Sequence, residues 1–238
     1  MTMKRLDLPS DRTAEGRSLG AEEKELLARV IDSGQLNCTG ATMVTRFEEA
    51  FARLHHAPGG VAVTSGSAAV HAALAALDLE PGDEVVTTPV TDFGALAPIL
   101  WHGAIPVFCD LDPESLNPTA ETLAARITPR TRAVVVTHLF GLPCAMGPIM
   151  AAVDPLPVIE DCAQAPLATW EGRRVGTFGR LAAFSFQQGK HITCGEGGIC
   201  LARDPALARR ARVFVNKAWP YGEPDPDHAF LALNYRMT

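Results

Sequence analysis

The 238-residue sequence lacks the features that mark several classes of protein. It has no apolar stretch long enough to cross a bilayer, and its N-terminus has no apolar run typical of a signal peptide. Its six cysteines include no C-x-x-C pair, so neither a zinc site nor a disulfide framework is indicated. The net charge of −6 offers no basic surface for nucleic acid. We therefore predict a cytoplasmic protein without membrane, nucleic-acid or metal partners.

Two phosphate-binding motifs are also missing. The sequence contains no G-x-G-x-x-G and no Walker lysine, which disfavours a dinucleotide or a nucleoside triphosphate as ligand. The one basic cluster, Arg209, Arg210 and Arg212, lies on a helix-like segment and is interpreted as a solvated face. Hydrophobic residues make up 47% of the chain, enough for one large core.

Short β-rich runs alternate with helical patterns along the chain. The runs are Val61–Thr64, Glu84–Thr88, Ile105–Cys109, Ala133–Thr137, Pro157–Glu160, Leu181–Phe186 and Gly198–Leu201. The helical patterns are Ala21–Asp32, Ala68–Leu77, Phe93–Trp101, Ala120–Ile127, Gly147–Val153 and Pro205–Val215. This alternation predicts an α/β fold, a mostly parallel seven-stranded sheet flanked by helices. We expect an N-terminal helical segment, residues 1–35, outside a larger domain, residues 36–238.

A lysine, Lys190, follows the apolar run Leu181–Phe186 and enters a turn rich in glycine. A short loop of this kind could hold the amine in a fixed position and lower its pKa by desolvation, as a Schiff-base lysine requires. The alternative is an ordinary surface lysine in a strand-ending turn.

A second segment, Ser65-Gly66-Ser67, joins a strand directly to a helix. Free backbone N–H groups and the helix dipole would converge at Ser67 and Ala68, which is typical of an anion site. A plain serine cap of the helix is the alternative.

Two carboxylates, Glu160 and Asp161, end a buried run, at the edge where open α/β sheets bind ligands. One of them is expected to face the ligand, where it could keep a heterocyclic nitrogen protonated; a helix cap or an ion pair is the alternative. Phe93, just after another strand, could cover a flat ring or could belong to the core.

A phosphate cradle, a ring-covering aromatic, a carboxylate and a lysine are together the set that pyridoxal 5′-phosphate requires. The sequence also resembles the DegT/DnrJ/EryC1/StrS family of pyridoxal-phosphate-dependent aminotransferases. The resemblance runs from about residue 26 to the end, through TSGSAAVHAAL, PGDEVVTTPVTDFGA, IEDCAQA, AFSFQQGKHITCGEGG and NYRM. It implies the large domain of the aspartate-aminotransferase-like fold. Because family members continue past this point, it also implies that a small C-terminal domain is absent and that the large domain is incomplete.

The resemblance implies a role for each matching residue. Lys190 would bind the cofactor covalently, Asp161 would pair with the pyridine nitrogen, and Gln164 would approach the ring hydroxyl. Phe93 would stack on the ring. The phosphate would be held by Gly66, Ser67, Ala68 and Ser185, and by Asn234 of a neighbouring subunit in a homodimer.

The implied reaction transfers an amino group from glutamate or glutamine to a keto-sugar or keto-cyclitol. Two substitutions depart from the family pattern: Ser67 replaces a usual Thr, and Asp92 replaces a usual Thr or Ser. A catalytically impaired paralogue that acts as a binding or regulatory module remains an alternative. A sugar dehydratase of the same fold is disfavoured, because His191 lies one position after the lysine site.

Overall fold

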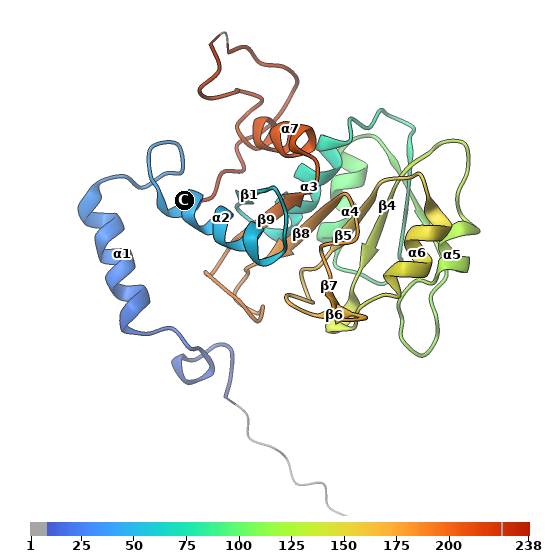
Figure 1. Cartoon of the computed structure of the whole chain (residues 1–238), viewed down its shortest axis with the longest axis horizontal. Coiled ribbons are helices and arrows are strands. Elements are labelled where there is room, and N and C mark those ends of the chain that lie inside the picture. The colour runs from blue at the N-terminus through green and yellow to red at the C-terminus, as the bar shows by residue number, and fades with distance from the viewer. Residues whose placement is uncertain (1–8, 225) are drawn as a thin grey trace, which may run out of the picture.

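The computed structural model describes residues 9–224 and 226–238 and confirms the predicted α/β fold (Figure 1). The strands are β1 (Gly59–Val63), β2 (Glu84–Thr87), β3 (Ile105–Phe108), β4 (Thr131–Thr137), β5 (Val158–Asp161), β8 (Leu181–Ser185) and β9 (Gly198–Ala202), with a separate hairpin of β6 (Thr169–Trp170) and β7 (Arg173–Arg174). The seven-stranded sheet has the order β1-β9-β8-β5-β4-β2-β3. Within this sheet, only β9 runs in the opposite direction to the other strands, so the carboxyl ends of the other six lie at one edge.

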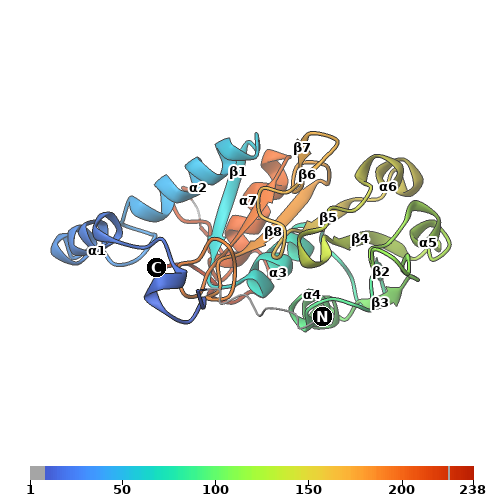
Figure 2. The same cartoon turned by 90° about the horizontal axis from the view of Figure 1, so that it is seen from below.

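Helices cover both faces of this sheet. The α-helices of the described residues are α1 (Ala21–Ser33), which lies away from the sheet, and α2 (Met43–Leu54), α3 (Gly66–Ala76), α4 (Phe93–Trp101), α5 (Ala120–Ala124), α6 (Met146–Val153) and α7 (Pro205–Val215). Core residues of α3, α4 and α7 pack on one face, and those of α2, α5 and α6 pack on the other. Figure 2 shows α2 and α6 on one side of the strands and α3 and α4 on the other.

Helix α3 is the most deeply buried helix of the fold and follows β1 directly. Its sequence is mostly alanine, and Ala69, Ala72 and Ala73 have no exposed surface. Small side chains let the helix approach β8 and β9 closely, so the core of this face is dense. The N-terminus of α3 is thereby held rigidly at the carboxyl-end edge of the sheet.

The helical boundaries agree with the sequence patterns except in two places. Helix α2 was not predicted, although Phe47 and Phe51 give it an apolar stripe that packs against Phe184 and Phe186. Helix α5 ends at Ala124 rather than Ile127, because tighter i→i−3 bonds replace the helical pattern there.

Helix α1 has the predicted extent and projects from the body of the molecule (Figure 1). It ends at Gly34, whose φ of 67° is left-handed, and none of its residues is buried. Residues 1–8 of the expected N-terminal segment lie outside the described residues, and the domain boundary at residue 35 stays a prediction.

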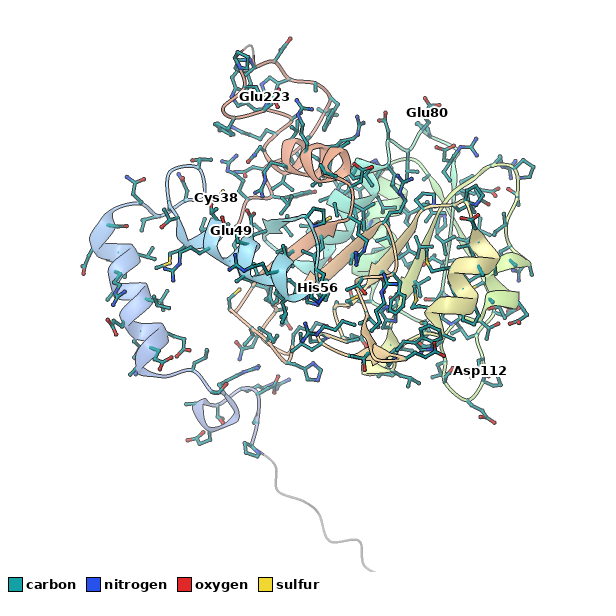
Figure 3. The ribbon with its side chains drawn as sticks, viewed as in Figure 1. Cys38, Glu49, His56, Glu80, Asp112 and Glu223 are labelled. Atoms are coloured by element: carbon teal, nitrogen blue, oxygen red, sulfur yellow. The ribbon has the colours of Figure 1, made fainter. Side chains whose placement is uncertain are left out.

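The cysteines and the basic cluster have simple structural roles. All six cysteines are free thiols, and four are buried, as expected for small apolar side chains; Cys38 lies between α1 and α2 (Figure 3). The three arginines of α7 were interpreted as a solvated face, but each pairs with an acidic side chain: Arg209 with Glu223, Arg210 with Asp78, and Arg212 with Glu48. No described helix has the length and apolarity needed to span a membrane.

Candidate active site

A cavity of about 200 Å³ opens at the carboxyl ends of the parallel strands. It brings together six of the nine predicted site residues, which are Gly66, Ser67, Asp161, Gln164, Ser185 and Lys190. They come from the β1–α3 turn, the end of β5 and the end of β8. Ligands of open α/β sheets bind at this edge, so the geometry agrees with the sequence prediction.

The turn Ser65-Gly66-Ser67 forms one wall of the cavity. Ser65 caps α3, because its Oγ accepts the N–H of Ala68 at 3.1 Å. A Cβ at position 66 would lie 2.7 Å from the Cβ of Ser185, so only glycine lets the turn pack against Ser185. The N–H groups of Gly66 and Ser67 have no intrahelical acceptor and lie at the positive end of the helix dipole, which makes this wall suitable for an anion.

Glu160 and Asp161 occupy opposite faces of β5, because side chains alternate along a strand. Asp161 lines the cavity, whereas Glu160 is buried behind it with no exposed surface. The sequence predicted that one of the two would face the ligand, and the structure assigns Asp161 to this position.

The Asp161 carboxylate is buried with only one hydrogen bond from the protein in the described residues, from the N–H of Ala163 at 3.0 Å. Desolvation raises the pKa of Asp161, and this hydrogen bond and the charge of Lys190 act in the opposite direction. A buried carboxylate with unused lone pairs is suited to a cationic N–H ligand.

Gln164 lies on the other side of the cavity with its amide held in one orientation. Its Oε1 accepts the backbone N–H of Phe140 at 2.8 Å. Because a backbone N–H can only donate, the carbonyl oxygen is assigned to this contact, and the side-chain NH₂ is left to donate into the cavity. This fits the predicted approach to a ring hydroxyl.

Lys190 follows β8 in a compact turn. Its N–H donates to the carbonyl of Gln187 at 2.9 Å, and the N–H of Gly189 donates to Oε1 of Gln187 at 2.7 Å. The lysine side chain lines the cavity, whereas the next residue, His191, is exposed and is not part of the lining. A lysine, not a histidine, therefore takes this position in the cavity.

Three predicted residues lie elsewhere. Ala68 contributes its N–H to the helix cap rather than to the cavity, and Phe93 is 68% exposed beside Trp101 in a neighbouring depression. Asn234 is outside the cavity, where its Oδ1 accepts the N–H of Arg236 at 3.2 Å. The structure of this single chain therefore does not bring Phe93 and Asn234 into the cavity, although Phe93 shares the neighbouring depression with Ser67 and Ala68.

The cavity also contains polar residues that the sequence analysis did not assign to the site. Asp92 lines it and caps α4, with Oδ1 accepting the N–H of Gly94 at 2.7 Å. Gln187 and Glu196 line the side next to Lys190. Both belong to the SFQQGK and GEGG motifs around the lysine, and this position in the sequence could have identified them as site residues.

A buried group of His138, Glu160 and Cys162 has ligand atoms within 4.8 Å of one another. Oε2 of Glu160 accepts from Gly176 N–H at 2.7 Å and pairs with Nε2 of His138 at 3.1 Å. Its Oε1 accepts two more N–H groups, and Nδ1 of His138 accepts the N–H of Cys144 at 3.1 Å. The carboxylate and imidazole lone pairs are thus occupied by protein donors, and we interpret the group as structural.

The comparison with known proteins agrees with this geometry. Residues 17–238 match the sequence model of the DegT/DnrJ/EryC1/StrS aminotransferase family. The chain belongs to this family. The resemblance found in the sequence motifs is therefore confirmed.

Individual members of the family are similar over most of this chain. GDP-perosamine synthase of Caulobacter vibrioides is 37% identical over 238 residues, which cover 98% of this chain and 62% of that protein. L-glutamine:2-deoxy-scyllo-inosose aminotransferase of Streptomyces kanamyceticus is 38% identical, covering 78% of this chain and 45% of that protein. The crystal structure of an aminotransferase from Psychrobacter cryohalolentis superimposes with a TM-score of 0.86 at 37% identity, covering 92% and 59% of the two chains. The chain thus spans roughly half to two thirds of the length of these family members.

Proposed function

We propose that this chain is the catalytic part of a pyridoxal-phosphate-dependent aminotransferase. The observation that carries the proposal is one cavity that contains a lysine, a buried carboxylate and a helix N-terminus. Proteins similar to this chain are a perosamine synthase and a scyllo-inosose aminotransferase, so the proposed acceptor is a keto-sugar or keto-cyclitol. Glutamate or glutamine is the proposed amino donor.

The side chains and amides around the cavity fit the cofactor. Asp161 has lone pairs that the protein leaves free, and a protonated pyridine nitrogen would satisfy them. The wall formed by Gly66 and Ser67 faces the cavity with helix N–H groups and is suited to the phosphate. Gln164 has its NH₂ available for the ring oxygen. Lys190 would hold the aldehyde carbon covalently.

Bound pyridoxal phosphate would supply an electron sink for the charge that develops when the donor loses its Cα proton. Asp161, as an anion, would keep the ring nitrogen protonated. The Nζ of Lys190 lies in the same cavity and would accept the donor's Cα proton as a base and give it up again as an acid. Burial of Asp161 strengthens its electrostatic effect, because the cavity wall has a low dielectric constant.

Asn234 has a place in this proposal only in a homodimer, whereas Phe93 is proposed to stack on the ring from the depression that it shares with Ser67 and Ala68. Phe93 lies on an exposed apolar surface with Trp101, which is 73% exposed, and Asn234 is also near the surface. We propose that a second subunit covers this surface and that Asn234 reaches the partner's phosphate site. A cytoplasmic location is proposed as well, in keeping with six free thiols in a chain without disulfides among its cysteines.

Covalent capture of the cofactor tests the proposal. The chain is incubated with pyridoxal phosphate, reduced with borohydride and digested, and the modified peptide is identified by mass spectrometry. We expect the pyridoxyl group on Lys190, and Lys190→Met should abolish it while leaving the unfolding free energy unchanged. Labelling of Lys217 in place of Lys190 would contradict the assignment.

A further inference from the structure

The turn that carries Lys190 is contacted by a segment from the far end of the chain. Residues Ser10–Arg17 form a compact N-terminal strap, closed by hydrogen bonds from Thr13 N–H to Ser10 C=O at 3.1 Å and from Gly16 N–H to Thr13 C=O at 3.2 Å. A Cβ at position 16 would lie 1.9 Å from the Ser10 oxygen, so the strap can close only around a glycine.

Arg17 joins this N-terminal strap to the lysine turn. Its Nη1 donates to the carbonyl of Lys190 itself at 3.1 Å, and its Nη2 donates to the carbonyl of Gln188. The third donor, Nε, is hydrogen bonded to the carbonyl of Asp11 at 3.0 Å. The Arg17 side chain is only 14% exposed, although most of the strap is exposed.

Further contacts run in the opposite direction, from the turn to the strap. Nε2 of Gln188 donates to the carbonyl of Asp11 at 2.8 Å. A Cβ at Gly189 would lie 3.6 Å from Oδ2 of Asp11, so the Asp11 side chain lies close to the backbone of the turn. The strap and the turn are therefore tied at several points across more than 170 residues of sequence.

We propose that Arg17 is a positioning residue that holds the backbone of the Gln187–Lys190 turn and so directs Lys190 into the cavity. The turn follows β8, and its residues Gln188 and Lys190 have no strand partner, so Arg17 supplies the donors to their carbonyls. The planar guanidinium presents its donors in a rigid fork that reaches both carbonyls and Asp11 together, whereas a lysine ammonium is a compact donor on a flexible chain. The N-terminal strap is thus part of the site although it is distant in sequence.

Two measurements test this inference, and only the second rests on the proposed function. Arg17→Ala is compared with Arg17→Lys and with Arg12→Ala. Arg12 is an exposed arginine of the same strap. Its backbone N–H donates to Ser10 Oγ at 3.1 Å, and an alanine at this position keeps that hydrogen bond. Arg12→Ala therefore matches the change in charge without removing the contact to the turn.

The first measurement is hydrogen exchange of the cofactor-free chain. Arg17→Ala should increase the exchange rate of the amides of residues 187–195 on the order of tenfold, because the turn opens locally more often without the guanidinium. The exchange rates of the α3 amides should stay unchanged. Arg12→Ala should behave like the wild type. An increase that extends equally into α3 would show a general loss of stability and overturn the positioning role.

The second measurement is the rate of pyridoxal phosphate capture at each lysine. Arg17→Ala should slow capture by Lys190 on the order of tenfold, because a misplaced reactive group loses rate steeply, and leave capture by Lys24 and Lys217 unchanged. Arg17→Lys should recover part of the rate. Wild-type capture by Arg17→Ala would overturn the inference. If the wild-type chain itself does not label Lys190, the proposed function fails, and the exchange measurement still decides whether Arg17 holds the turn.

Discussion

Two regions meet at β5, and each contains one carboxylate of the Glu160-Asp161 pair. Behind the strand, Glu160 receives three backbone N–H groups at 2.7 Å and the ring of His138. In front of it, Asp161 faces the cavity with one N–H at 3.0 Å. The hydrogen-bonding capacity of one carboxylate is thus filled by the protein, and that of its neighbour in sequence is largely unused.

The difference separates a structural carboxylate from a ligand-binding one. The donors to Glu160 come from Gly176, Phe178 and Gly179, so the carboxylate holds the segment after β7 against the sheet. Asp161 leaves hydrogen-bonding capacity for a group that the protein does not supply. Burial alone does not distinguish the two, because both side chains are buried; the number of protein donors does.

The largest expected effect is that of Asp161→Asn on catalysis. The neutral amide cannot keep the ring nitrogen protonated, so we expect exchange of the donor's Cα proton to fall on the order of a thousandfold. Capture of the cofactor by Lys190 should continue. Exchange of the Cα proton into deuterated water measures this rate, and a variant within about threefold of the wild type would show that another group serves the nitrogen.

The converse substitution, Glu160→Gln, should affect stability. The glutamine NH₂ would face backbone N–H groups that can only donate, so buried hydrogen bonds to that side of the carboxylate are lost. The unfolding free energy should therefore fall by about 3 kcal/mol. Denaturant titration measures this value, with exposed Glu171→Gln as the control. Capture at Lys190 per folded molecule should stay unchanged; a loss of capture with normal stability would mean that Glu160 belongs to the site.

The smallest effect is the pH dependence that Asp161 gives to the cofactor-free chain. Burial raises its pKa in the folded state. Between the ordinary pKa of an aspartate and this raised value, the folded chain binds more protons than the unfolded chain. The unfolding free energy should therefore decrease as the pH rises through this window. The contribution is fully present below the ordinary pKa and lost above the raised one.

The amide of Asp161→Asn does not titrate, so this variant is the reference for the wild type. The difference in unfolding free energy between the wild type and Asp161→Asn should favour the wild type more at low pH than at neutral pH. Denaturant titrations of both chains across this range provide the measurement. Parallel curves would show that Asp161 titrates in the folded chain as it does in the unfolded one.

The sequence by itself determined the fold class and pointed to most of the residues that line the candidate site. Strands such as β4 and β8 are continuous apolar runs bounded by turn residues, and this pattern is local, so it is visible without a structure. Lys190 and the β1–α3 turn were found for the same reason, since each follows its strand directly. The amphipathic pattern of α2 was also local, and it was missed.

Only the tertiary structure decided which groups meet. The local pattern did not distinguish Glu160 from Asp161, although the family resemblance assigned Asp161, because the donors to Glu160 lie 16 to 22 residues away. It placed Phe93 over the ring, and the structure places Asp92 in the cavity and Phe93 on the exposed surface. It gave no sign that Arg17 contacts Lys190, across 173 positions. Such contacts depend on how the sheet and its connections bring distant segments together, and neither periodicity nor residue type records that.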